Sequence, residues 1–364
     1  MTACDDCLRR TALVARLAPH VERGRRERRR LGELLALPDE GLVAALAGGH
    51  RRAIERAHRA FDPDRARERL RASAITAVCR HDPDYPPRLL QADDAPAVLH
   101  VAGDPARLAV LADRDAPAVA VVGARRAGID GLEVARALGR GLAAAGVTVI
   151  SGMALGIDAA AHVGALDVGG PTITVLAGGA DVAYPASKRS LHRELVRTQA
   201  AISEMPPGFA PLRWCFPARN RTIAGLASMT IVVEATERSG SLITAELAQE
   251  LGRAVGAVPG PVTAPRCAGS NALLRDGALV IRDAQDALDE ALGVGVATAL
   301  AGHRAEELAP GLRALLRRVE DGSDTVSSLA ATPSEAQRAL AELAELELLG
   351  FLRRAPGGRY VRLP

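Results

Sequence analysis

Short apolar runs alternate with alanine-rich stretches of helical periodicity through the middle of this 364-residue chain. The runs are rich in Val, Ile and Ala, and they lie at 118–123, 147–152, 172–179, 200–204, 229–235 and 254–260. Apolar runs without polar alternation are typical of strands buried on both faces, and helices between them favour parallel pairing. The pattern from about residue 115 to 292 therefore predicts a parallel sheet covered by helices.

Two segments of different pattern flank this region. The first 75 residues or so carry leucines at helical spacing with a polar break at 37–41 (LPDEG), which predicts a helical unit. The end of the chain predicts three helices and then a hairpin, the order of a winged helix. We therefore expect an α/β protein with a helical unit at 1–80, an extended Rossmann-like unit at 81–295 and a winged helix at 305–364.

The third helix of the expected winged helix is acidic. Across 334–349 it carries four glutamates against one arginine, Arg338. Phosphate contacts dominate DNA affinity, so DNA repels a helix of net negative charge. The pattern favours a protein-interaction or regulatory role for this unit over DNA recognition, which stays open.

The net charge of the chain says little about what it binds. A formal net charge of +3 is mildly basic, so an anionic partner has to be argued from where the arginines gather. One such run, 21–30 (VERGRRERRR), is either a solvated helix face or an auxiliary nucleic-acid contact. We see no signal-peptide pattern and no apolar run of membrane-spanning length, which predicts a cytoplasmic protein.

The cysteines fit a reducing compartment. There are five, an odd number. Cys4 and Cys7 form a CxxC pair, and a zinc site would need a second pair of ligands that only Cys79 and His81 offer. Because those two lie far away in the sequence, we expect no metal and two inert thiols at a frayed terminus.

The loop after the first predicted strand of this region is the first candidate site. It reads VVGARRAGIDG (121–131), and two glycines five positions apart match the outline of a P-loop. Ile129 and Asp130 stand where Lys and Ser or Thr should follow, and an arginine replaces the second glycine of a dinucleotide site. Backbone N–H groups at a helix start, beside Arg125 and Arg126, still suit a phosphate.

Small and polar residues also stand where later predicted strands end and the next helices begin. The stretches are SGMALGIDAAAH (151–162) and ERSGSLITAE (237–246), with further loops at 259–260 and 269–271. Their candidate phosphate contacts are Ser151, Gly152, Ser239, Gly240, Ser241, Thr244 and Asn271. His162 is either a structural or a ligand-facing histidine. Several such turns, joined by an RNR segment at 219–221, favour a long phosphate-lined groove over a mononucleotide pocket.

Aromatic residues are scarce and gather beside arginines. Of eight Phe, Tyr and Trp side chains, three lie within 209–216. We expect Phe216 to pack as support for the RNR segment. Phe209 and Trp214 are candidates for stacking on bases, and a buried packing role for both is left open.

Taken in order, these blocks resemble the DprA/Smf family, the DNA-processing proteins of bacterial natural transformation. The resemblance runs from DYPPRLL (84–90) through the blocks quoted above, FPARNRTIAGL and VVEATERSGSLITA, to GSNALLRDGA, and it covers the chain from about Tyr85. In the first loop this chain has Ala124, Gly128 and Asp130 instead of the residues usual in the family. Two possible hydroxyl contacts are lost and an acid is added near the groove, so the loop either binds DNA more weakly or Arg126 compensates.

The resemblance implies a protein that binds single-stranded DNA without catalysis. Family members dimerise through the Rossmann-like unit and help load the recombinase RecA onto DNA coated by single-strand-binding protein. By motif, the implied DNA pocket comprises Gly123, Arg125, Ser151, Gly152, Arg219, Asn220, Arg221, Ser239, Gly240 and Ser241, with Lys188 as a further candidate.

An enzyme is the alternative. Thr244 and Glu246 resemble, crudely, the threonine and catalytic glutamate of phosphoribohydrolase-like Rossmann enzymes. The paired-glycine motif of those enzymes is absent, and the first loop argues against a nicotinamide dehydrogenase. We expect no cofactor.

Overall fold

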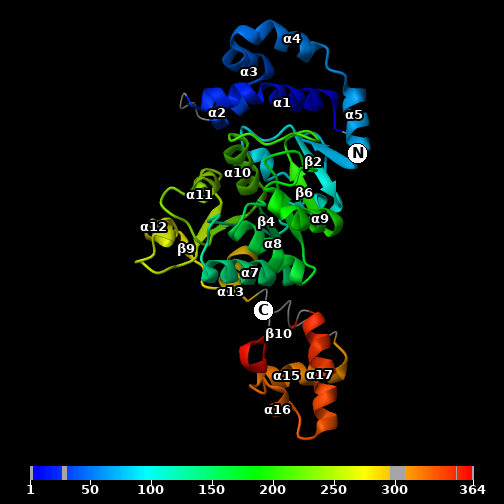
Figure 1. Cartoon of the computed structure of the whole chain (residues 1–364), viewed down its shortest axis with the longest axis vertical. Coiled ribbons are helices and arrows are strands. Elements are labelled where there is room, and N and C mark those ends of the chain that lie inside the picture. Colours follow the sequence, from blue (N-terminus) through cyan, green and yellow to red (C-terminus); the bar gives the residue numbers. More distant parts are fainter. Residues whose placement is uncertain (1–2, 27–30, 296–307, 350, 363–364) are drawn as a thin grey trace.

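A mixed β-sheet forms the centre of the protein (Figure 1), seen here in a computed structural model that describes residues 3–26, 31–295, 308–349 and 351–362. Within these residues the sheet has nine strands in the order β1-β2-β6-β5-β4-β3-β7-β8-β9. The strands are β1 (Ile75–Cys79), β2 (Val98–Gly103), β3 (Ala118–Val122), β4 (Thr148–Ser151), β5 (Thr172–Val175), β6 (Ala200–Ser203), β7 (Met229–Val232), β8 (Ala254–Ala257) and β9 (Leu279–Val280).

All six strands predicted from the apolar runs are confirmed, as β3 to β8. They pair in parallel. The parallel sheet predicted for 115–292 is therefore confirmed. The sheet extends beyond that region at one edge, where β2 pairs antiparallel with β6 and β1 pairs antiparallel with β2. These two strands precede the first crossover helix, so nothing in the chain order requires them to run parallel.

The strands are apolar throughout because both faces of the sheet are covered. All five residues of β3 are buried. Ala118, Ala120 and Val122 face one apolar cluster, and Val119 and Val121 face another on the opposite side. This division follows from the period of two along a strand.

Helices supply both covering layers. On one side lie α7 (Ile129–Ala144), α8 (Ile157–Asp167) and α13 (Ala284–Leu292), whose residues join one cluster. The opposite cluster receives α10 (Cys215–Leu226) and α11 (Gly240–Glu250). The remaining helices of this region are α6 (Ala106–Ala109), α9 (Arg189–Thr198) and α12 (Ala268–Arg275).

The N-terminal segment is helical, as predicted. Its helices are α1 (Asp5–Arg26), α2 (Leu31–Ala36), α3 (Asp39–Leu46), α4 (Arg51–Arg59) and α5 (Pro63–Ala72). The predicted break between α2 and α3 falls at Pro38. The first helix extends through part of the arginine run, and residues 27–30 of that run lie outside the described residues.

The frayed terminus expected from the sequence is not what the described residues form. Ala3 and Cys7 are both buried, and they join a cluster with the β1 residues Ile75, Ala77 and Cys79. The start of α1 therefore belongs to the core beside the first strand.

The described residues from 308 onward have their own core. They form α15 (Pro310–Glu320), α16 (Val326–Leu329), α17 (Pro333–Leu348) and an antiparallel pair, β10 (Leu352–Ala355) and β11 (Arg359–Arg362). Leu315, Leu343 and Tyr360 are among the buried residues that join these elements. The predicted order of three helices and a hairpin is thus confirmed. In the described part of the chain we find no helix with the length and apolarity that a membrane span requires.

Candidate nucleic-acid interface

The chain order of the sheet reverses at β3, which lies between β4 and β7. Open α/β sheets bind ligands beyond the carboxyl ends of their strands, near such a reversal. Gly123 begins the loop after β3. A Cβ atom there would lie 2.6 Å from Ile157 Cγ1 and 2.9 Å from the Glu234 carbonyl oxygen, so this glycine is needed for close packing.

Glu234, which follows β7, holds this loop from inside the protein. Its side chain is buried, and Oε2 accepts a 2.8 Å hydrogen bond from the Gly128 N–H at the start of α7. Oε1 pairs with Arg266 Nε at 2.8 Å. The sequence suggested that N–H groups at this helix start would hold a phosphate, but the Gly128 N–H already donates to a carboxylate.

Arg125 and Arg126 project from the same loop and are exposed. The guanidinium carbon of Arg125 lies 5.2 Å from the centre of the Phe216 ring, within the range of a cation–π contact. Phe216 in turn lies 5.4 Å from the ring of Tyr184, which is 48% exposed. One cation and two rings therefore meet at the mouth of the sheet.

Two concavities share Arg125. The smaller, of about 190 Å³, is lined by Arg125, Met153, Gly178, Tyr184, Phe216 and Arg219 among others. The larger, of about 430 Å³, is open and includes Arg125, Arg126 and Lys188 in its lining. Together these hollows bring three of the predicted cationic contacts to one surface.

The RNR segment lies on α10 and divides into buried and accessible parts. Arg219 is 7% exposed, and its Nη1 donates to the Val175 carbonyl oxygen at 2.5 Å. Burial lowers the pKa of Arg219, and the nearby Asp158 carboxylate opposes that effect. Asn220 is half-buried one helical turn beyond Phe216, and its Nδ2 donates to the Gly240 carbonyl oxygen at 3.2 Å.

Arg221 faces the interior. Its side chain is 7% exposed and forms ion pairs with the carboxylates of Glu204 and Asp94. A further hydrogen bond reaches the Asp94 carbonyl oxygen. This guanidinium joins the segment before β2 to the end of β6, and burial leaves it no access to a nucleic acid.

The predicted residues after β4 are also internal. Ser151 is fully buried and donates its hydroxyl to the Val121 carbonyl oxygen at 2.6 Å. A Cβ atom on Gly152 would lie 1.9 Å from Arg219 Nη1. His162 is buried between the Gly152 carbonyl oxygen, 2.9 Å from Nε2, and the Thr172 hydroxyl, 2.7 Å from Nδ1. Burial lowers the pKa of His162 to about 4, so the ring is neutral and structural.

At the start of α11, only some of the predicted phosphate contacts lie at the surface. Ser239 caps the helix by accepting the Ser241 N–H, and Gly240 is exposed. Ser241 and Thr244 are buried. Asn271, further along the chain, uses its carboxamide to bond both the N–H and the carbonyl of Gly260.

Of the two roles left open for the aromatic candidates, the structure shows packing. Trp214 is fully buried, packs with Ala18 and Val21 of α1, and donates its backbone N–H to Glu22 at 2.9 Å. Phe209 packs partly buried against the same cluster. The rings that line the smaller concavity are the exposed Tyr184 and the half-buried Phe216. The sequence signal for Tyr184 was its position in a Tyr-Pro pair just before Lys188.

Accessible candidates thus form a connected surface, which we call the basic strip. It consists of Lys188, Tyr184, Arg125, Arg126, Phe216, Asn220 and Gly240. The buried candidates, Ser151, Arg219 and Arg221 among them, form the scaffold beneath it.

Residues 76–292, more than half of the chain, match the sequence family described as DNA recombination-mediator protein A. The chain belongs to this family. "Protein Smf" of Escherichia coli is 37% identical over 290 residues, which cover 77% of this chain and 75% of that protein. A "putative DNA processing protein DprA" of Mycobacterium tuberculosis is 47% identical over 195 residues, covering 54% of this chain. The chain spans about half (49%) of that relative's length.

Solved structures of the recombination-mediator family agree with the fold. The X-ray structure of DNA processing protein A from Streptococcus pneumoniae matches with a TM-score of 0.63 and 32% identity, over 80% of this chain and 99% of that one. A Helicobacter pylori structure, described as the single-stranded DNA binding mode of DNA processing protein A, matches with a TM-score of 0.53 and 28% identity. It covers 59% of this chain and 94% of the other.

Proposed function

We propose that this protein binds single-stranded DNA along the basic strip. The observation that carries the proposal is Arg125 packed on Phe216 beside the exposed ring of Tyr184. Single strands bind to surfaces that combine cations with aromatic faces, because phosphates pair with the cations while bases stack on the rings. The H. pylori relative of similar fold is described as a single-stranded DNA-binding protein, which supports the same assignment.

Each part of the basic strip has a separate role in this proposal. Arg125, Arg126 and Lys188 meet the phosphate backbone across the larger concavity. Tyr184 and Phe216 offer faces for bases at the smaller one. Gly240, exposed at the start of α11, adds a backbone contact where a helix favours an anion. Arg219 supports the floor rather than reaching the DNA.

Family membership extends the proposal to the role of a recombination mediator. In this role the protein holds incoming single-stranded DNA during natural transformation in the cytoplasm and passes it to the recombinase RecA in the presence of single-strand-binding protein. We propose the unit boundaries 1–80, 81–295 and 305–364, and a homodimer formed through the middle unit. A bridge between Thr325 and Arg359 adds a third segment to the C-terminal hairpin, which supports a winged helix there.

The enzyme alternative is less well supported. Thr244 is buried whereas Glu246, two residues on, is exposed, so the two do not face a common site. A phosphoribohydrolase would need both at one substrate.

Fluorescence anisotropy with labelled oligonucleotides tests the proposal. The protein should bind oligo-dT more tightly than a duplex of equal length, and the affinity should fall as salt rises. Equal affinity for both forms, or none for the single strand, would reject it. Release of free base from a nucleoside monophosphate, lost in Glu246→Gln, would establish the enzyme instead.

A further inference from the structure

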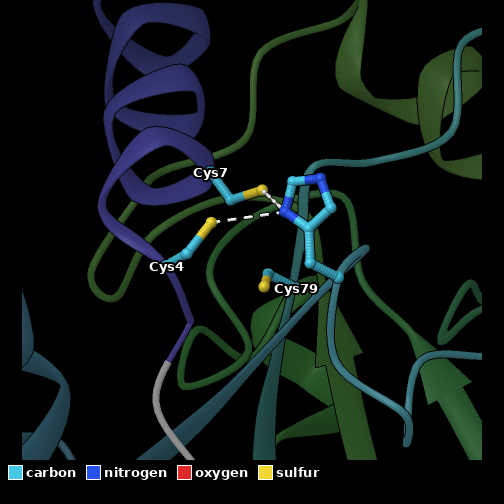
Figure 2. Close-up of side chains that lie close together, drawn as sticks. Cys4, Cys7 and Cys79 are labelled. Atoms are coloured by element: carbon cyan, nitrogen blue, oxygen red, sulfur yellow. Dashed lines mark hydrogen bonds between the residues drawn. The ribbon is translucent and has the colours of Figure 1, made fainter.

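Four side chains far apart in the sequence converge beside the start of α1. They are Cys4, Cys7, Cys79 and His81, and their ligand atoms all lie within 4.8 Å of one another. Figure 2 shows the thiols of Cys4, Cys7 and Cys79 gathered between the first turn of α1 and the end of β1. Cys4 immediately precedes α1 and Cys7 lies in its first turn, while Cys79 is the last residue of β1 and His81 follows it by two positions.

We propose that these four residues bind a structural zinc ion. Three thiolates and one imidazole form a ligand set that closed, tetrahedral zinc sites use, and the spacing C-x₂-C is common among them. The second half, Cys79 and His81, has the close spacing that places two ligands on one turn. This pairing of two short motifs is a stronger signal than either CxxC or CxH alone.

The distances fit an ion of this size. Zinc–sulfur and zinc–nitrogen bonds of about 2.3 and 2.0 Å at tetrahedral angles place sulfur about 3.5 Å from nitrogen and about 3.8 Å from another sulfur. The sulfurs of Cys4 and Cys7 lie 3.4 and 3.5 Å from His81 Nδ1. Only a small rearrangement is needed to bring all four atoms around one centre.

Neither a disulfide nor packing alone accounts for all four side chains. The chain's five cysteines all lie within the described residues, and none forms a disulfide. A disulfide between Cys4 and Cys7 would leave the Cys79 thiol and the His81 imidazole beside it without a common partner. Packing alone does not require a polar imidazole ring next to three thiols, whereas zinc uses all four groups.

The ion would fasten the N-terminal helices to the edge of the sheet. Cys7 and Cys79 are each 4% exposed and already share a core cluster. Arg67 of α5 bonds the Ala3 carbonyl oxygen and also pairs with the Asp5 carboxylate, so α5 is already tied to the start of the chain. Zinc would join the start of α1 to β1 across more than seventy positions of sequence, and binding would release protons from the thiols.

Metal content of the full-length protein, purified with reducing agent and without added chelator, is the first test. We expect about one zinc per chain by mass spectrometry of the metal. The variant Cys79→Ser should lose it, while Cys267→Ser, which removes another buried free cysteine outside the cluster, should keep it. No zinc in the parent, or as much in Cys79→Ser as in Cys267→Ser, overturns the proposal.

Cobalt substitution of the parent chain tests the coordination even if Cys79→Ser fails to fold. After zinc removal, Co²⁺ should give intense ligand-field bands of tetrahedral geometry together with thiolate charge-transfer bands. His81 is exposed, so His81→Ala should fold, bind Co²⁺ more weakly and shift those bands. A spectrum like that of hydrated Co²⁺, or an unchanged spectrum in His81→Ala, would contradict this ligand set.

Discussion

Two pairs of arginines lie near the end of the sheet and have opposite roles. Arg125 and Arg126 are exposed in the loop after β3, with Arg125 against an aromatic ring. Arg219 and Arg221 are buried in α10, where carbonyl oxygens and carboxylates take their donors. In the proposed function, the exposed pair offers its charge to the DNA backbone, whereas the buried pair is held inside the protein by its own partners.

The difference follows from where the opposite charges lie. Asp94 and Glu204 are themselves nearly buried, and a buried carboxylate needs a cation beside it. Among the residues lining the larger concavity at Arg125 and Arg126, Glu133 is the one acid. Arg221 of the RNR segment is thus neutralised inside the protein, whereas cations outnumber acids in the lining of the larger concavity.

Arg221→Ala should have the largest effect. It leaves Glu204 as an uncompensated buried charge, so we expect the free energy of unfolding to fall by about 3–5 kcal/mol. Urea denaturation followed by circular dichroism measures this. Arg126→Ala is the matched control and should leave stability within about 0.5 kcal/mol.

A second change can separate the ion pair from packing. If Arg221 acts through its charge, the double variant Arg221→Met with Glu204→Gln should recover part of the lost stability, since it removes the cation together with the more buried of its two carboxylate partners. A parent-like stability of Arg221→Ala alone would show that this arginine is not part of the scaffold.

The next largest effect should be a pH dependence of the folding stability, caused by the buried His162. Burial lowers the pKa of His162 to about 4, against about 6.5 in an unfolded chain. Between these values the unfolded state binds a proton that the folded state does not, so stability falls as pH drops from 6.5 towards 4. The shift corresponds to about 3 kcal/mol.

The variant His162→Gln isolates that contribution. Its stability should be nearly independent of this titration, so the gap between parent and variant should narrow as pH falls from 6.5 to 4. Urea denaturation at several pH values provides the data. A gap that stays constant with pH would mean that His162 does not titrate on unfolding as expected.

The exposed pair should act on DNA binding and hardly at all on stability. For Arg125→Ala with Arg126→Ala, we expect the slope of log affinity against log salt to become shallower by about 1.4, since each phosphate contact on a single strand contributes about 0.7. The control is Arg114→Ala. Arg114 is exposed just before β3, on the side of the amino end of that strand. Equal slopes for the double variant and this control would remove the pair from the interface.

Phe216→Ala should have a smaller effect on the same measurement. The ring is half-buried, so we expect a loss of affinity near the low end for base stacking, about 1 kcal/mol, with an unchanged salt slope. If Phe216→Ala instead made the dependence of log affinity on log salt shallower, Phe216 would act by holding Arg125 in place and not by stacking on a base.

Trp214, in contrast, should show no response to DNA. It is the only tryptophan and is fully buried, so intrinsic fluorescence excited selectively from tryptophan reports this one site. Saturating oligo-dT should leave its emission unquenched. Strong quenching would indicate that a base reaches the ring and that the packing against α1 opens on binding.

The sheet could be predicted from sequence because its signal is local. Uninterrupted apolar runs exclude a solvated face, and helical spacing between them favours parallel crossovers, so β3 to β8 were predictable. The strands β1 and β2 were missed because they precede the region in which apolar runs alternate with helices. Their antiparallel pairing at the sheet edge has no comparable local marker.

Exposure was much less predictable than fold. Arg221 and Arg125 look alike in a motif, and only the positions of Asp94 and Glu204 in space distinguish them. The same holds for Trp214, which α1 covers from nearly two hundred positions away. Cys4 and Cys79 also come together only through tertiary contact, so distance along the chain could not predict the cluster in which they lie.

Glu234 has a consequence for the kinetics of binding. Because its carboxylate holds Gly128, and its carbonyl oxygen accepts the Ala124 N–H at 2.7 Å, the loop after β3 gives up its backbone entropy when the protein folds. If DNA binds as proposed, it therefore has to order only side chains such as Arg125 and Arg126, at a lower entropic cost than closing a loop. Association on such a preorganised surface should be governed by diffusion and electrostatic steering, and it should slow as salt rises.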